Sequence, residues 1–171
     1  MTRLLPAAAT AVVLLLAAAG CSTGGDPVPY TTREQLAQRP SLEEQRARFE
    51  QLQDEVQERL GAELGLTAWS PLDSETTAAC DNGEVPEASI AFLQARLLTG
   101  GVPDASWQQA VDVLVEVAEP YGFDSLERVV DDPGEHEVVL RGEHEALIRF
   151  GTLQNATLGV TTGCHLMEAG G

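Results

Sequence analysis

The sequence contains no lysine, and all ten of its basic residues are arginine. Asp and Glu together number 27, which gives a formal net charge of −17. Because phosphate binding needs clustered Lys or Arg, this balance argues against nucleic acid as a partner. It also argues against binding of the polypeptide to anionic lipid by charge attraction. A surface this acidic is typical of a soluble protein that repels its own copies.

The sequence also lacks the motifs that mark common enzymes. It has no phosphate-binding glycine loop, no Gly-x-Ser-x-Gly elbow and no His-Glu-x-x-His helix. Carboxylates are so abundant that a pair of them has no diagnostic value. We therefore predict no catalytic residues, no cofactor and no enzymatic activity. The alternative is a small cell-surface hydrolase or metal-dependent enzyme. It requires a pocket with a free thiol, a bound metal, or a histidine hydrogen-bonded to an acid.

The first 21 residues have the pattern of a bacterial export signal followed by a lipidation site. Arg3 is the only early charge, and an apolar run extends from Leu4 to Ala19. That run is short for a membrane-spanning helix, which needs about 20 residues. Small residues precede Cys21, so we predict cleavage before Cys21 and attachment of diacylglycerol to its thiol. Lipoboxes more often have leucine where this chain has Ala18.

These signals divide the chain into three parts. Residues 1–20 are predicted to be the signal peptide, and residues 21–31 a lipidated tether rich in Gly and Pro. Residues 32–168 then form a single domain. Because each buried CH₂ contributes about 0.8 kcal/mol, two acyl chains would hold the protein stably on the extracytoplasmic face of the cell membrane.

Two stretches have the periodicity of amphipathic helices. The first begins at the capping box Ser41–Glu44 and is expected to extend to about Leu60, with Gly61 and Gly65 ending it. The second begins near Ser106 and ends at Pro120. The apolar stripe of the first is narrow and could pack on its own domain or on a partner, of which packing on its own domain is favoured. Each helix has its apolar residues on one face. They are Leu42, Phe49, Leu52, Val56 and Leu60 in the first helix, and Trp107, Ala110, Val111, Leu114, Val115 and Ala118 in the second.

Short β-type runs follow the second helix, at residues 126–131, 137–141, 146–150 and 157–162. A tight turn is expected at Asp132–Glu135. A loop at residues 142–144 would form a hairpin in which Val138, Leu140, Ala146, Ile148 and Phe150 share one face, and this register is preferred because it buries the most apolar side chains. Residues 88–98 fit a strand or a helix, and we favour a strand, whereas residues 66–86 are expected to be irregular. The prediction is an α+β fold in which an antiparallel meander of about four to five strands packs against a helix, with an additional N-terminal helix.

The C-terminal half resembles the LppA-type lipoproteins of actinobacteria, and segments upstream are similar too. The resemblance covers most of residues 31–166 and implies a small lipid-anchored envelope protein without an assigned biochemical role. It implies no catalytic residues. It rests on these residues: Trp107, Tyr121-Gly122-Phe123, the run from Val129 to Val138, Thr162-Gly163-Cys164-His165-Leu166, the run from Thr32 to Leu36, and Arg39-Pro40-Ser41.

Two cysteines remain if Cys21 carries lipid. In an oxidising compartment we expect Cys80 and Cys164 to form a disulfide. The competing interpretation is a thiol nucleophile at Cys164 with His165 as its base. Adjacent side chains on a strand point to opposite faces, which is poor geometry for that pair, so the disulfide is favoured.

Gly-Glu-His-Glu occurs twice, at residues 134–137 and 142–145. The proposed hairpin places His136 and His144 at opposite ends, roughly 20 Å apart at about 3.3 Å per residue, so one ion cannot bridge them. Each histidine is expected to lie in a solvated turn, and no metal site is predicted.

The sequence thus favours a non-catalytic binding or structural module, with an envelope protein or wall component as its unidentified partner. This hypothesis predicts an exposed apolar patch or groove, for example along the 41–60 helix. A carrier of an apolar ligand would instead need a cavity between sheet and helix.

Overall fold

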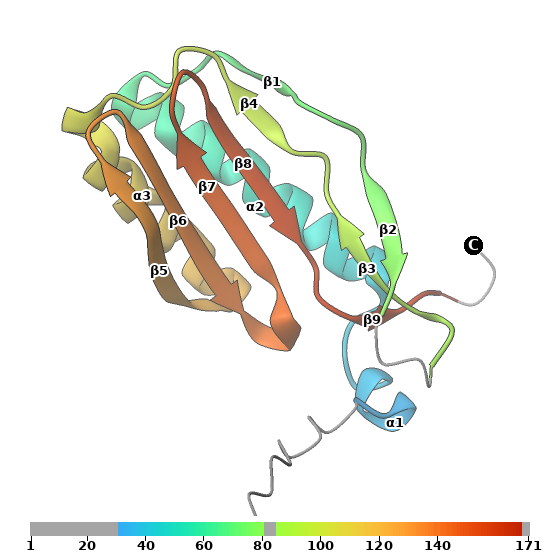
Figure 1. The fold of residues 1–171 in the computed structure, drawn as a ribbon. Coiled ribbons are helices and arrows are strands. Elements are labelled where there is room, and N and C mark those ends of the chain that lie inside the picture. The colour runs from blue at the N-terminus through green and yellow to red at the C-terminus, as the bar shows by residue number, and fades with distance from the viewer. Residues whose placement is uncertain (1–30, 81–84, 169–171) are drawn as a thin grey trace, which may run out of the picture.

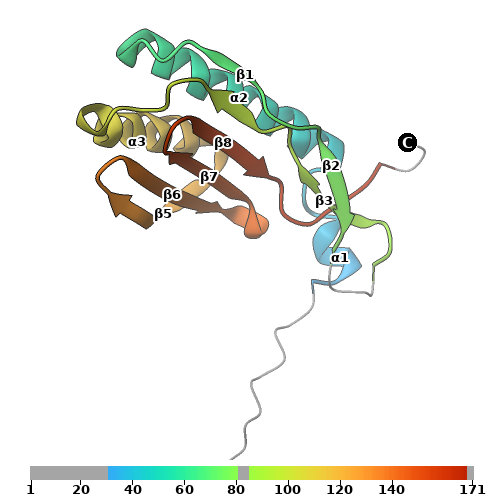
Figure 2. The same ribbon diagram turned by 45° about the horizontal axis from the view of Figure 1, so that its top comes forward.

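The computed structural model describes residues 31–80 and 85–168. The predicted signal peptide, Cys21 and the tether up to Tyr30 lie outside the described residues. Within them the chain forms one antiparallel sheet, and two long helices pack side by side on one of its faces (Figures 1 and 2). The α+β class is confirmed. Among the described residues, no helix is both long and apolar enough to cross a membrane.

Two helices in the N-terminal part each begin at a capping box. The short helix α1 (Arg33–Leu36) begins at a capping box of Thr32 with Gln35. Helix α2 (Leu42–Leu64) begins at the predicted capping box, where Ser41 and Glu44 each accept a hydrogen bond from the other's backbone N–H. The helix continues beyond Leu60 because Gly61 is accommodated within it, and it ends at Gly65 in the left-handed conformation. The predicted end at about Leu60 was therefore too early, and of the two predicted glycines only Gly65 ends the helix.

Helix α3 (Asp104–Ala118) carries the second predicted stripe, and a 3₁₀ turn, η1 (Glu119–Tyr121), follows it. The helix begins two residues before Ser106, after Pro103, which supplies no side-chain cap. The Asp104 carboxylate instead accepts hydrogen bonds from the backbone N–H of Gly134, at 3.0 and 3.1 Å. The start of α3 is thereby bonded to a distant turn of the sheet.

The sheet contains nine strands in the described part of the chain, rather than four to five. Its main path runs β1-β4-β8-β7-β6-β5, and β3 pairs with β2, β8 and β9 beside that path. All of these strand pairs are antiparallel. The bounds are as follows: β1 Trp69–Pro71, β2 Thr76–Ala79, β3 Ala88–Phe92, β4 Arg96–Leu98, β5 Phe123–Asp132, β6 Glu135–Gly142, β7 Leu147–Thr152, β8 Ala156–Thr161 and β9 His165–Leu166.

The strands that the sequence did not predict are short. Strands β1 and β2 lie within residues 66–86, which were expected to be irregular, and β2 is exposed along its whole length, so it shows no alternation of apolar side chains. Residues 88–98 are extended as favoured, but they form two strands, β3 and β4. Strand β9 has only two residues. Strands this short are fixed by their neighbours rather than by their own pattern.

The central hairpin has the predicted register. Val138 lies opposite Phe150, and Leu140 lies opposite Ile148, with a 3₁₀ turn, η2 (Glu143–Glu145), connecting β6 to β7. All four side chains are buried beneath the helices in one core with α2 and α3. The apolar stripe of α2 is buried in the same core, so it packs on its own domain as expected. In the described part of the chain, no helix lies against the opposite sheet face (Figure 2).

Candidate functional site

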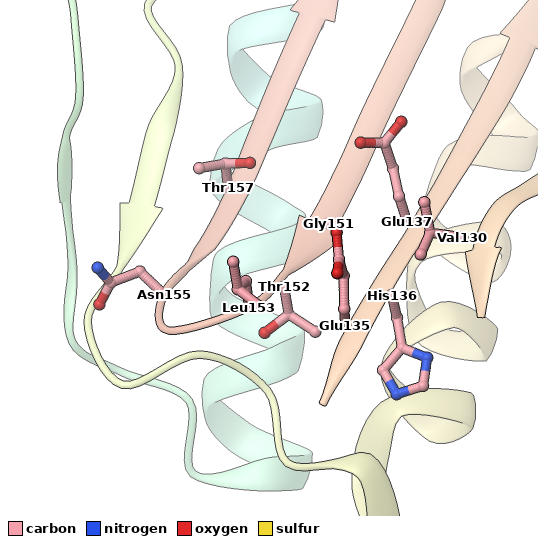
Figure 3. Close-up of a pocket in the computed structure, with 9 residues that line it drawn as sticks. All are labelled: Val130, Glu135, His136, Glu137, Gly151, Thr152, Leu153, Asn155 and Thr157. Carbon is pink, nitrogen blue, oxygen red and sulfur yellow. The ribbon is translucent and has the colours of Figure 1, made fainter. Parts of the chain in front are cut away.

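A hollow of about 250 Å³ lies on the uncovered sheet face (Figure 3). Its lining includes one row of paired residues across four strands, namely Val130, Glu137, Gly151 and Thr157. Gly151 leaves the centre of this row without a side chain, and a Cβ there would lie 3.2 Å from the carbonyl oxygen of His136. The hollow is therefore produced by one glycine in a row of larger residues.

Several polar groups of the hollow already have partners. The Arg149 guanidinium donates to Glu137 at 2.6 Å. Thr152 Oγ1 accepts from the backbone N–H of Val102, and Asn155 Oδ1 accepts from that of Gly100. These bonds attach the loop after β4 to the β7–β8 turn. They fix the shape of the hollow and leave it few polar groups for a ligand.

His136 lies behind this hollow, with its ring on the helix side of the sheet. Its Nδ1 is 2.9 Å from Asp131 Oδ1 and its Nε2 is 3.3 Å from Asp104 Oδ1. The ring stacks on Trp107 with centroids 5.2 Å apart, and Trp107 stacks in turn on Phe150. Only 8% of His136 is exposed, so the expectation of a solvated turn residue was wrong.

This arrangement meets one requirement of the enzyme alternative, a histidine hydrogen-bonded to an acid. A catalytic base needs one ring nitrogen for the acid that orients it and the other for the reacting group. In His136 both nitrogens face carboxylates, and the ring is covered by Trp107. In this arrangement His136 joins β6 to β5 and to the start of α3.

The predicted disulfide is present between Cys80 and Cys164, which are 84 residues apart in the sequence. Both half-cystines lie in a small second core with Leu36, Val85 and Ala88. The bridge joins the end of β2 to the segment before β9, and Arg39 donates to the carbonyl oxygen of Cys164 at 2.7 Å. Because both thiols are consumed, neither is available as a nucleophile.

His165 is fully buried beside this bridge. Its ring nitrogens lie 3.0 Å from the carbonyl oxygens of Pro40 and Thr162. Burial lowers the pKa of His165, an effect opposed by these two hydrogen bonds. The ring links the segment before α2 to the segment after β8, and it is not oriented toward Cys164 as a base.

His144 packs its ring edgewise against His165, with centroids 5.8 Å apart. Burial lowers the pKa of His144 as well, helped by the nearby charges of Arg39 and His165. His144 and Glu145 both have positive φ angles, 59° and 69°, which is uncommon for non-glycine residues. Gly163 packs against this turn so closely that a Cβ would lie 2.1 Å from the His144 carbonyl oxygen.

The two Gly-Glu-His-Glu repeats do not form a common metal site in the described part of the chain. His136 pairs with Thr152 at the start of β6, whereas His144 lies after its end, so the two repeats are separated by the strand as expected. Within residues 31–80 and 85–168, no group of three or more His, Cys, Asp and Glu side chains is arranged to hold an ion.

A second surface was not foreseen from the sequence. A groove of about 260 Å³ runs between the end of α3 and the first half of β5. Leu126 forms part of its wall and is 42% exposed, and Val129 farther along β5 is 49% exposed. The sequence did carry a signal, because the run 126–131 alternates poorly and puts apolar residues on both faces of one strand. The predicted apolar patch on α2 is buried instead.

Comparison with known proteins gives a consistent result. The family model described as LppA, "Lipoprotein confined to pathogenic Mycobacterium", matches residues 29–168. The crystal structure of the lipoprotein LppA from Mycobacterium tuberculosis superposes with a TM-score of 0.63 at 15% identity, over 79% of this chain and 83% of that one. No curated protein matches.

A DUF4853 family protein from Actinomyces odontolyticus also has this fold. Its crystal structure superposes with a TM-score of 0.57 at 15% identity, over 78% of this chain and 73% of that one. At such identities the two structures establish the fold alone. The family match extends over most of the chain, including both half-cystines and the whole sheet. This chain therefore belongs to the LppA family of lipoproteins.

Proposed function

We propose that this lipoprotein is anchored through acylated Cys21 on the outer face of the cell membrane and acts there as a non-catalytic binding module. The proposal rests on one observation: the histidine and cysteine side chains that could act in catalysis are bonded to other groups of the fold. Both ring nitrogens of His136 face carboxylates, and Cys80 and Cys164 are bridged. These groups hold the fold together, while one sheet face and the α3–β5 groove remain open.

The anchor is supported by the family and by the sequence before Cys21. Two acyl chains hold a protein on a bilayer without further contacts, since each buried CH₂ contributes about 0.8 kcal/mol. The intact mass of the protein extracted from membranes tests this part. A mass that fits cleavage before Cys21 plus acyl chains is expected, and Cys21→Ser is expected to release the protein into the medium. An unacylated mass would remove the anchor from the proposal.

The binding role is tested by photo-cross-linking on intact cells. A benzophenone amino acid is placed at Thr157 in the hollow, at Leu126 in the groove, or at Glu58 on the solvent side of α2. A defined partner band is expected from Thr157 or Leu126 and not from Glu58. Equal labelling at all three positions, or none, would contradict a binding module.

The enzyme alternative is tested with His136→Asn, which keeps a hydrogen-bonding side chain but removes the imidazole. If the protein acts by binding, a variant that is still folded keeps its function in cells. Loss of function without loss of folded protein would favour catalysis by His136. Reaction of Cys80 or Cys164 with iodoacetamide before reduction would likewise favour a thiol enzyme.

A further inference from the structure

The groove between α3 and β5 has an apolar floor. Phe123 and Leu140 lie at the bottom and are each 2% exposed. Val115 of α3 forms one wall, and Leu126 of β5 forms the other with 42% of its surface exposed. A leucine exposed to this extent beside a formed hollow has apolar surface that a partner could bury, at about 25 cal/mol per Å².

The outer wall of the groove is a sheet edge. Among residues 31–80 and 85–168, strand β5 ends the strand path and pairs with β6 alone. Register shifts between Phe123 and Ser125 and between Arg128 and Val130 bracket a regular segment, Ser125–Arg128. An edge strand presents unpaired backbone N–H and C=O groups that can bond to another extended chain. The irregularities at both ends limit that pairing to a short segment.

The charged residues of the groove indicate the charge of its partner. Glu119 and Asp124 are the charged residues of its lining, and the structure gives neither side chain an ion-pair partner among the described residues. The neighbouring arginines are directed to other groups: Arg128 donates to Gln108 nearer the start of α3, Arg141 to Glu127, and Arg48 to the Pro120 carbonyl oxygen. The groove thus combines an apolar floor with two carboxylates that have no ion-pair partner among the described residues, to which a cationic segment is complementary.

The same charge argues against two other occupants. A second copy of this chain also carries a net charge of −17, so edge-to-edge pairing of two β5 strands brings like charges together. The chain's own residues 22–30 contain Asp26 and no basic residue, so they do not complement the groove either.

From these features we infer that the α3–β5 groove binds an extended, basic polypeptide segment. The segment adds to the free edge of β5 at Ser125–Arg128, inserts an apolar side chain beside Leu126, and places Lys or Arg near Glu119 and Asp124. This inference rests on the proposed binding role and names its surface and the chemistry of its partner.

The test uses the mature acylated chain in phosphatidylcholine nanodiscs and a short fluorescent peptide in which arginine and leucine alternate. Fluorescence anisotropy at physiological salt gives the Kd. Two control peptides alternate arginine with serine, or glutamate with leucine. Tight binding of the arginine–leucine peptide alone is expected, because the groove needs both the charge and the apolar side chain.

Matched variants locate the site. The double variant Glu119→Gln with Asp124→Asn is compared with Asp54→Asn plus Glu58→Gln, which removes the same charge from the exposed side of α2. The groove pair is expected to weaken binding by roughly tenfold, and the α2 pair by less than about twofold. Leu126→Ala is compared with Leu72→Ala, whose leucine is exposed between β1 and β2, and only the former is expected to raise the Kd.

Hydrogen exchange of the complex measures the pairing of the peptide with β5 directly. Backbone amides of Ser125–Arg128 are expected to gain protection when the peptide binds. Equal weakening by both double variants would overturn the inference, because binding would then follow overall charge. Protection of another strand, or equal binding of the arginine–serine peptide, would overturn it too. The acyl mass and the cross-linking at Thr157 test the broader proposal separately, so the two can fail independently.

Discussion

The imidazole of His136 stacks on the indole of Trp107 with ring centroids 5.2 Å apart and planes 14° apart. This contact joins the second strand of a hairpin to the first turn of α3. The His136 nitrogens extend the connection to Asp131 and Asp104, and Asp104 continues it to the N–H of Gly134. The β5–β6 turn is thereby attached to the helix that covers the sheet.

Replacing His136 by leucine is expected to destabilise the fold by about 2 kcal/mol, since buried hydrogen bonds to charged groups are lost. Urea unfolding of the variant measures this. A double-mutant cycle with Asp131→Asn is expected to give a coupling of about 1 kcal/mol, because the two side chains touch. Additive effects in the cycle would contradict a direct contribution from this hydrogen bond.

The Cys80–Cys164 bridge closes a loop of 84 residues. The chain-entropy model attributes about 4.5 kcal/mol of stability to a loop of this length. The double variant Cys80→Ala with Cys164→Ala is expected to lose about that amount, measured by urea unfolding against the unreduced parent. Reduction of the parent should match the double variant. An unchanged unfolding midpoint would show that the core around Leu36 is sufficient by itself.

Gly163 and Gly159 form a matched pair for a test of backbone packing. A Cβ at Gly163 meets the His144 carbonyl oxygen at 2.1 Å and would sit at a φ of +73°, whereas a Cβ at Gly159 has no neighbour within 4 Å. Gly163→Ala is expected to cost about 3 kcal/mol. Gly159→Ala, in the middle of β8, is expected to stabilise by about 0.5 kcal/mol. Thermal unfolding of both variants measures these two effects. Similar Tm values for the two variants would contradict the close packing of Gly163 against His144.

The two histidines near the disulfide make stability depend on pH. Burial lowers the pKa of His165 and of His144 from the usual 6.5. Below about pH 6.5 the unfolded chain therefore binds more protons than the folded one, and stability falls as the pH falls. Well above pH 6.5 both states are neutral at these sites, and their contribution no longer changes.

Imidazole NMR titration measures this directly, and both midpoints are expected below 6.5. Urea unfolding at about pH 7.5 and about pH 5.5 gives the consequence for stability. His165→Asn is expected to reduce the difference between the two pH values, even if it lowers stability at both. A midpoint above 6.5 for His165 would mean that its bonds to Pro40 and Thr162 outweigh burial.

Local sequence signals determined much of this protein. The capping box of Ser41 and Glu44 set the start of α2, because side-chain capping needs only residues three positions apart. The alternation of Val138, Leu140, Ile148 and Phe150 set the register of the central hairpin, because a shift by one residue would expose all of them. The two thiols left besides Cys21 were sufficient to predict the disulfide.

Only the tertiary structure decided the rest. Strands β1, β2 and β9 are too short and too exposed to carry a pattern of their own, so their neighbours fix them. Asp104 and His136 are 32 residues apart and look like a helix start and a turn residue until the fold brings them together. The α3–β5 groove is likewise a product of the tertiary structure. It exists because α3 ends where β5 begins the sheet edge, and no local pattern encodes the space between two elements.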